Sequence, residues 1–315
     1  MWTGFVCPRA IPYAKTRTDH RSEKANYNRC AEAESMSEPL RLLLIGAHPD
    51  DCEYHAGGLA TLYRQFGHVV KMVSVTNGQA GHHEHAGPTL AARRSREFAA
   101  ACSIIGAECE IGSQPDGHLV PTLENRLWMI RLIRQFRPDL VLTHRPNDYH
   151  PDHRYTSQLV QDSAYLLTVP AIAPEVPHLP RDPVICYFPD EFHKPYPFQP
   201  EVAIDVGSVV NTILDMLHCH QSQFYEWLPY NTGRLHEVPG TPEARRQWLA
   251  EQFLPRLRRQ AERFRELLMS AYGPTHGVRV EYAEVFEPCE YGAALDQSAK
   301  QRLFGFIWDA VRSQS

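Results

Sequence analysis

Short apolar segments alternate with longer amphipathic segments from residue 41 onward. The segments 42–45 and 140–143 are unbroken runs of Leu, Ile, Val and Thr, as is typical of strands buried on both faces of a sheet. Between such strands apolar residues recur at helical spacing, and the helices end at Gly67, at Gly106 and before Pro138. The predicted elements are, in order, strand 42–45, helix 56–65, strand 69–76, helix 90–105, strand 109–112, helix 123–136, strand 140–143 and helix 154–167.

This alternation predicts an α/β fold: a Rossmann-like three-layer αβα architecture with a mainly parallel sheet in the order 3-2-1-4-5. The pattern changes after Pro170, where proline becomes frequent as far as Pro200. We interpret this half as a C-terminal extension of the same domain, which gives a single domain over 39–315. Residues 1–38 show no lasting period and predict a disordered extension. The elements predicted in the second half are strands 184–187 and 202–204, helix 209–218 and an arginine-rich helix 247–268 that breaks near Pro255.

Composition and charge exclude several classes of protein. Of the 315 residues, 43% are hydrophobic and 22% charged, an ordinary globular balance. The net charge of −5 predicts neither a nucleic acid nor a membrane surface as partner, and no apolar run approaches the roughly 18 residues of a membrane-spanning helix. The eight cysteines form no CxxC pair and no secretory signal precedes them, so reduced thiols and a cytoplasmic location are expected.

Dense polar clusters follow the first and fourth predicted strands. His48, Asp50 and Asp51 come after the first strand, and the segment 144–153 comes after the fourth. In the order 3-2-1-4-5 these strands are neighbours at the switch point of the sheet, so both clusters face one crevice. Two histidines and one carboxylate with an open position describe a catalytic zinc site, since a structural site normally has four protein ligands. Taken alone, the first cluster also fits a polar turn with a helix N-cap.

The clusters contain two recognisable motifs, His48-Pro49-Asp50-Asp51 followed by Glu53 and Gly57-Gly58, and His150-Pro151-Asp152-His153. These motifs resemble those of the LmbE/PIG-L family of zinc-dependent N-acetylglucosamine deacetylases. The resemblance covers about residues 40–160 and continues weakly to a strand-like segment at 282–286. Cys52 stands where many family members have glutamate. This difference does not change the predicted metal ligands, but it leaves the subfamily unassigned.

The resemblance assigns roles to the motif residues. It implies that His48, Asp51 and His153 hold one zinc ion per chain, and that Asp50 is the general base. It also implies that His150, in its protonated form, helps stabilise the oxyanion of the tetrahedral intermediate. Another divalent metal, such as iron, is compatible with the same donor set.

Four further residues are expected around the substrate. Arg94 falls in the apolar stripe of the second predicted helix, where a charge needs a partner; the resemblance implies substrate contact, and the alternative is a structural ion pair. Asp116 resembles the family aspartate that binds sugar hydroxyls, although an ordinary turn also explains it. Tyr149 either reaches the substrate or packs. Asp152 is expected to orient His150 as an outer-sphere partner, with a surface turn as the alternative.

The sequence therefore predicts a zinc-dependent deacetylase that hydrolyses an N-acetyl group from an N-acetylglucosamine-type amino-sugar conjugate. The alternatives are an amide hydrolase that removes a different acyl group and a metal-binding, non-catalytic Rossmann-like protein. A dinucleotide-binding domain is disfavoured, because no Gly-x-Gly-x-x-Gly motif follows the first strand. The expected partner is a small-molecule amino-sugar conjugate, and the frequent oligomers of the family leave a homo-oligomer open.

Overall fold

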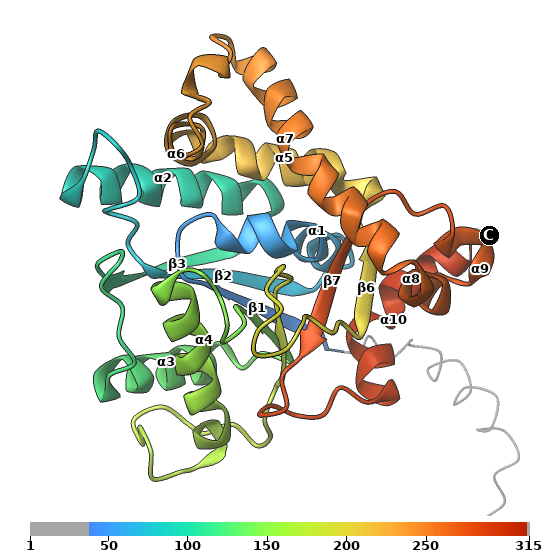
Figure 1. The fold of residues 1–315 in the computed structure, drawn as a ribbon. Helices are drawn as coiled ribbons and strands as arrows, with labels where there is room; N and C mark the ends of the chain where they lie inside the picture. The colour runs from blue at the N-terminus through green and yellow to red at the C-terminus, as the bar shows by residue number, and fades with distance from the viewer. Residues whose placement is uncertain (1–37, 314–315) are drawn as a thin grey trace, which may run out of the picture. The chain divides into compact units, whose positions relative to one another are not determined.

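The computed structural model describes residues 38–313, and within that range seven strands form one sheet in the order β3-β2-β1-β4-β5-β7-β6 (Figure 1). The strands are β1 (Arg41–Gly46), β2 (Val69–Thr76), β3 (Glu108–Gln114), β4 (Leu140–Thr143), β5 (Val184–Tyr187), β6 (Val202–Asp205) and β7 (Ala283–Pro288). The first five are parallel, whereas β7 runs antiparallel to both β5 and β6. The predicted α/β class and the order 3-2-1-4-5 are confirmed.

Helices cover both faces of this sheet. They are α1 (Asp51–Gln65), α2 (Gly87–Ile105), α3 (Leu123–Phe136), α4 (Pro151–Ala164), α5 (Val210–Cys219), α6 (Leu228–Asn231), α7 (Pro242–Arg263), α8 (Arg265–Tyr272), α9 (Pro274–Gly277) and α10 (Gln297–Arg312). In β1, Leu42 and Leu44 belong to the apolar core on one face, and Leu43 and Ile45 to the core on the other, because side chains alternate along a strand. In Figure 1, α1, α2 and α5 lie over one face and α3 and α4 over the other.

Helix α1 begins at Asp51, five residues before the predicted start. Ala56 has non-helical dihedral angles (φ −146°, ψ 24°), so a kink separates the first turn from the apolar remainder of the helix. Past the kink, the N–H groups of Gly58 and Leu59 donate hydrogen bonds to the carboxylate of Glu284 in β7, at 2.7 and 2.8 Å. Glycine is required at position 58, because a Cβ there would lie 2.4 Å from Val206 Cγ1. The first turn, which carries Asp51, is thus set apart from the helix that packs in the core.

The second half of the chain differs from its prediction at Pro255. Helix α7 passes through Pro255 without ending, so the break predicted there is wrong; the chain leaves helical geometry at Phe264, before α8. Strand β6 pairs with β7, which comes some 80 residues later in the chain than β6. Residues 39–315 cluster as one compact unit. The prediction of a disordered extension over 1–38 falls, apart from Glu38, outside the described residues.

No helix within 38–313 is both long enough and apolar enough to cross a membrane.

Candidate metal centre and active site

The two polar clusters lie side by side because β1 and β4 are hydrogen-bonded neighbours. Ile45 pairs with Thr143 at the carboxyl ends of these strands. His48 sits in the turn that follows β1, Asp51 begins α1, and His153 lies in the first turn of α4. The fold therefore brings together side chains that are 105 positions apart in the sequence.

Three nitrogen and oxygen atoms converge on one point of this crevice. His48 Nδ1 lies 3.1 Å from His153 Nε2 and 3.5 Å from Asp51 Oδ2, and His153 Nε2 lies 3.6 Å from Asp51 Oδ2. Tetrahedral ligands at the usual zinc bond lengths are about 3.4 Å apart, so this triangle has the dimensions of three zinc ligands. The residues present fit the ion that the resemblance implies.

Carboxylates hold the other nitrogen of each imidazole. His48 Nε2 lies 3.2 Å from both Asp116 Oδ1 and Asp152 Oδ2, and His153 Nδ1 lies 3.1 Å from Asp148 Oδ1. A carboxylate on the outer ring nitrogen fixes the proton there and leaves the inner nitrogen as a lone-pair donor, as in many metal sites. The two inner nitrogens then face each other as acceptors, an arrangement that a cation between them stabilises.

The electrostatics of the cluster also favour a cation. Burial lowers the pKa of His48, but contacts with Asp116, Asp152 and Asp51 outweigh it and raise the pKa well above its ordinary value. Burial raises the pKa of Asp51, but the neighbouring imidazoles of His153 and His144 outweigh it and hold the pKa well below its usual range. Asp51 is therefore an anion, and the site attracts positive charge.

Asp50 has a different environment from its neighbour Asp51. Burial raises the pKa of Asp50 to about 6, although the guanidinium of Arg94 opposes this shift. Arg94 Nη2 lies 3.2 Å from Asp50 Oδ1, and its Nη1 lies 3.5 Å from Asp116 Oδ2. Arg94 is 2% exposed and also donates to the carbonyls of Gly78 and Pro49. The ion pair that was the alternative for Arg94 is present; its contact with substrate stays a prediction.

His150 is the N-cap of α4. Its Nδ1 accepts a hydrogen bond from the backbone N–H of Asp152 at 3.1 Å, so a neutral ring carries its proton on Nε2. Burial lowers the pKa of His150, and the neighbouring His48 lowers it further, so the structure favours the neutral ring over the protonated form expected from the resemblance. A neutral His150 still donates a hydrogen bond from Nε2.

The carboxylate of Asp152 contacts His48, and its backbone N–H forms the hydrogen bond with His150; its role in orienting His150 stays a prediction. The carboxylate accepts hydrogen bonds from the backbone N–H groups of Gly117 and Leu119, at 2.6 and 3.2 Å, in addition to its contact with His48. Asp152 is fully buried, which rules out the alternative of a surface turn. The side chain that Asp152 orients is thus His48, a candidate metal ligand.

Sequence reasoning missed two residues of the segment 144–153. His144 Nε2 lies 3.1 Å from Asp51 Oδ2, and its ring stacks on that of His153 with centroids 4.0 Å apart. Asp148 supports His153, as described above, and its pKa is lowered to about 2 by that contact despite burial. The density of polar residues after β4 marked this segment, but not which side chains face the centre. Within the described range, other groups of donors close enough to share an ion are His48, His150 and His153; His48, Asp116, His150 and Asp152; and Asp51, His144 and His153.

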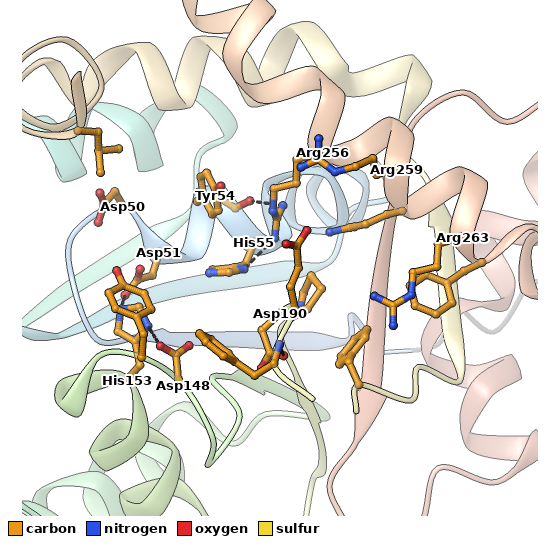
Figure 2. Close-up of a pocket in the computed structure, with 18 of the residues that line it drawn as sticks. Asp50, Asp51, Tyr54, His55, Asp148, His153, Asp190, Arg256, Arg259 and Arg263 are labelled. Carbon is orange, nitrogen blue, oxygen red and sulfur yellow. Dashed lines mark hydrogen bonds and ion pairs between the residues drawn. The ribbon is translucent and has the colours of Figure 1, made fainter. Parts of the chain in front are cut away.

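The metal centre opens into a cavity of about 910 Å³ (Figure 2). Figure 2 shows Asp50, Asp51 and His153 at one end of it, and Tyr149, which is 71% exposed, is also a lining residue. Asp116 and Arg94 are buried and do not line the cavity. The remaining lining residues come mainly from α1, from the segment 189–198 and from α7. A cavity of this size accommodates a ligand much larger than an acetamide group.

This fold and site define a Rossmann-like α/β protein in which two histidines and a carboxylate are arranged for one divalent metal ion. Residues 43–164 match the PIG-L family, whose description is GlcNAc-PI de-N-acetylase. The chain belongs to this family, and the resemblance inferred from the two motifs is confirmed. Every predicted site residue falls in the matched region.

Individual relatives and a solved structure are also similar to this chain. Diacetylchitobiose deacetylase from Thermococcus kodakarensis is 30% identical over 217 residues, which cover 62% of this chain and 77% of the relative. A 4-oxalmesaconate hydratase from Pseudomonas putida is 24% identical over 212 residues, covering 64% and 81% of the two chains. The structure of N,N'-diacetylchitobiose deacetylase from Pyrococcus horikoshii superposes with a TM-score of 0.62 at 21% identity, over 87% of this chain and 95% of that one. That last likeness establishes the shared fold.

Proposed function

We propose that this protein hydrolyses the N-acetyl group of an N-acetylglucosamine-type conjugate, with one zinc ion per chain. The observation that carries the proposal is the triangle of His48 Nδ1, Asp51 Oδ2 and His153 Nε2 with a second carboxylate, Asp50, beside it. The deacetylase relatives support amide hydrolysis as the reaction and an amino sugar as the substrate class. Zinc suits this donor set, and another divalent metal would also fit it.

Each residue then has a defined task. A zinc ion held by His48, Asp51 and His153 would lower the pKa of a water molecule to about 7 and polarise the amide carbonyl. Asp50 accepts the proton of the attacking water and returns it to the departing amine, for which a pKa of about 6 is well placed. His150 donates its Nε2–H to the carbonyl oxygen as negative charge develops there. Arg94 holds the Asp50 carboxylate in position through their 3.2 Å ion pair.

The decisive experiment measures acetate release from a panel of N-acetylglucosamine conjugates by zinc-loaded protein. We expect release that a chelator abolishes and added zinc restores. Asp50→Asn should lower kcat by about 10²- to 10⁴-fold while zinc content is unchanged, because Asp50 is not among the three ligands. Asp215→Asn, at an exposed position of α5, is the matched control and should behave as the native protein. Acetate release that persists in Asp50→Asn would exclude Asp50 as the base.

A second candidate is a hydratase, which the relative from Pseudomonas putida favours. Hydration adds water to a carbon–carbon double bond and releases no acetate, so the same metal centre would yield a different product. The remaining alternative is hydrolysis of a different acyl group. It is tested by adding N-propionyl and N-formyl analogues to the substrates of the acetate-release experiment. Loss of absorbance of a conjugated unsaturated acid, without release of any acyl group, would favour the hydratase.

The proposal extends to a cytoplasmic location and a homo-oligomer. The cysteines of the described range are unpaired thiols, which supports a reducing compartment. Cell fractionation and size-exclusion chromatography with light scattering test these two points.

A further inference from the structure

Three arginines of α7 line the cavity away from the metal centre. Arg256, Arg259 and Arg263 are spaced by three and four residues, which places them on one face of the helix. Figure 2 shows all three projecting from α7 on the side of the cavity opposite Asp51 and His153. The cavity thus has a metal end and an arginine end.

None of these arginines forms an ion pair with any residue of the described range. Arg256 donates hydrogen bonds to the Tyr54 carbonyl at 3.0 Å and to His55 Nδ1 at 2.9 Å, and its guanidinium lies 4.5 Å from the centroid of the Tyr54 ring. Arg263 lies over the ring of Phe264, 5.0 Å from its centroid. Arg259 and Arg263 are exposed to the cavity with their hydrogen-bond donors unused.

Two arginines of α7 that do not line the cavity have acidic partners, whereas a third, Arg245, donates to the Pro239 carbonyl and to Gln221. Arg246 pairs with Asp215 at 2.6 Å, and Arg258 pairs with Glu281 at 2.7 Å. Helix α5 and the segment before β7 therefore supply acidic partners to Arg246 and Arg258, and no carboxylate pairs with the three arginines that face the cavity. An unpaired cluster of guanidinium groups on one wall of a substrate cavity is suited to an anionic ligand.

The acidic residues at this end do not cancel the arginines. Asp190 is engaged by Arg145, with 2.6 Å between Arg145 Nη1 and Asp190 Oδ1. Glu191 and Glu262 also line the cavity, and neither forms an ion pair. Three guanidinium groups against two free carboxylates leave a net positive charge at the arginine end.

We infer that Arg259 and Arg263 bind an anionic group of the substrate, a carboxylate or a phosphate, while the acyl group of the same molecule lies at the metal centre. Arg256 adds positive potential and, through Tyr54 and His55, ties α7 to α1. The guanidinium fork matches both anions in a bidentate geometry. This inference rests on the proposed function for the identity of the acyl end, and it narrows the substrate to an acidic N-acyl amino-sugar conjugate.

The test compares ligands that differ only in charge at one position. We would use the glucosaminide of a short hydroxy acid, its methyl ester and the corresponding phosphate ester, all as free amines, and measure their dissociation constants by calorimetry on the zinc-loaded full chain. The acid or the phosphate should bind at least about tenfold more tightly than the ester. The anion that binds more tightly identifies the group. In the double variant Arg259→Gln/Arg263→Gln, the ratio of the ester and acid dissociation constants should fall to about twofold. The control double variant Arg246→Gln/Arg258→Gln should keep the ratio of the native protein.

Equal binding of acid and ester by the native protein, or a difference that survives in Arg259→Gln/Arg263→Gln, would overturn the inference. Both arginines are exposed and without ion pairs, so the double variant should melt at the temperature of the native protein, which circular dichroism checks. Acetate release from the N-acetylated forms is measured separately. Release without any preference for the acid overturns the anionic subsite alone, whereas a preference without release overturns the proposed function and keeps the subsite.

Discussion

Asp50 and Asp51 are adjacent in sequence, yet their pKa values move in opposite directions. Asp51 touches imidazole rings and stays ionised, whereas burial raises the pKa of Asp50 to about 6. The difference arises because the side chains leave the turn toward different neighbours, the histidines on one side and Arg94 on the other. Two carboxylates in different environments can thus serve as metal ligand and as proton acceptor within one turn of chain.

The Asp50 pKa predicts an acid limb in the activity profile. The base must be unprotonated, so kcat should rise with pH through a midpoint at or below about 6, because a bound cation lowers the Asp50 pKa in the same direction as Arg94. Arg94→Gln removes one source of that lowering and should move the midpoint to higher pH. A pH profile of kcat for both proteins measures the shift.

The same variant separates the two roles considered for Arg94. Direct contact with substrate predicts a higher KM at all pH values, whereas the ion pair with Asp50 predicts a displaced acid limb. Arg96→Gln, at an exposed position of the same helix, is the control and should change neither. An unchanged midpoint in Arg94→Gln would contradict the electrostatic role of this ion pair.

Asp148 is expected to control metal affinity without touching the metal. Its carboxylate lies 3.1 Å from His153 Nδ1, so Asp148→Asn should weaken the orientation of that ring and lower metal affinity by about 10- to 100-fold. Competition with a fluorescent zinc chelator measures the affinity. Asp162→Asn serves as the control, because Asp162 lies in α4, the helix of His153, but near its other end. If Asp148→Asn bound zinc as tightly as the native protein, the contact would have no such role.

The broken helix α1 depends on a strand from the other end of the chain. Beyond the kink at Ala56, the N–H groups of Gly58 and Leu59 would lack partners without the fully buried carboxylate of Glu284. Burial raises the pKa of Glu284 to about 7, while its two backbone hydrogen bonds oppose the rise. The carboxylate therefore acts as a cap for the second part of α1.

Glu284 should make the stability of the fold depend on pH. Because its folded pKa is raised from 4.5 to about 7, its contribution is fully present below about pH 4.5 and is lost as the pH rises through about 7. That loss is on the order of 3 kcal/mol. Glu284→Gln does not ionise and should remove this slope, at a cost of about 1 kcal/mol for the altered hydrogen bonds. Urea unfolding between pH 5 and 8 measures both effects; an unchanged slope in the variant would contradict the assignment.

The elements that the sequence predicted well are those whose signal is local. The sequence predicted the strands 42–45 and 140–143 and the end of α2 at Gly106 correctly, because burial and helix termination are encoded by the residues themselves. The start of α1 was not predicted correctly, because the kink at Ala56 is stabilised by Glu284, more than 220 positions away. Likewise Pro255 signals a break, but the packing of Leu257 and Phe253 in the core keeps α7 continuous.

At the scale of the whole molecule, the metal centre joins two separate parts of the chain. His48 and Asp51 follow β1, and His153 follows β4, so an ion held by all three would link both segments only in the folded state. At a hundredfold excess over its dissociation constant, an ion stabilises the fold by about 2.7 kcal/mol. Chelation should therefore lower the melting temperature by about 5 °C, and zinc should restore it. Differential scanning calorimetry tests this, with His48→Ala expected to abolish the zinc response.

The site was predictable as far as adjacent strands could be inferred. The order 3-2-1-4-5 is enough to bring His48 and His153 to one crevice, and the motifs supplied the remaining ligand. The contacts of Asp152 with His48, and of His144 with Asp51, depend on the exact path of two loops, which no local pattern encodes. The arginine end of the cavity was likewise hidden, since the sequence predicted only an arginine-rich helix in this region.

The antiparallel position of β7 between β5 and β6 has a consequence for how the protein is synthesised. Because β7 lies at Ala283–Pro288 of a 315-residue chain, β5 and β6 leave the ribosome before the strand that pairs with both. Helix α7, which carries the arginine end of the cavity, is also synthesised before β7. Exposed strand edges promote aggregation until their partner arrives. A premature stop codon between positions 154 and 282 would therefore yield an insoluble product, even though His48, Asp51 and His153 had already been translated.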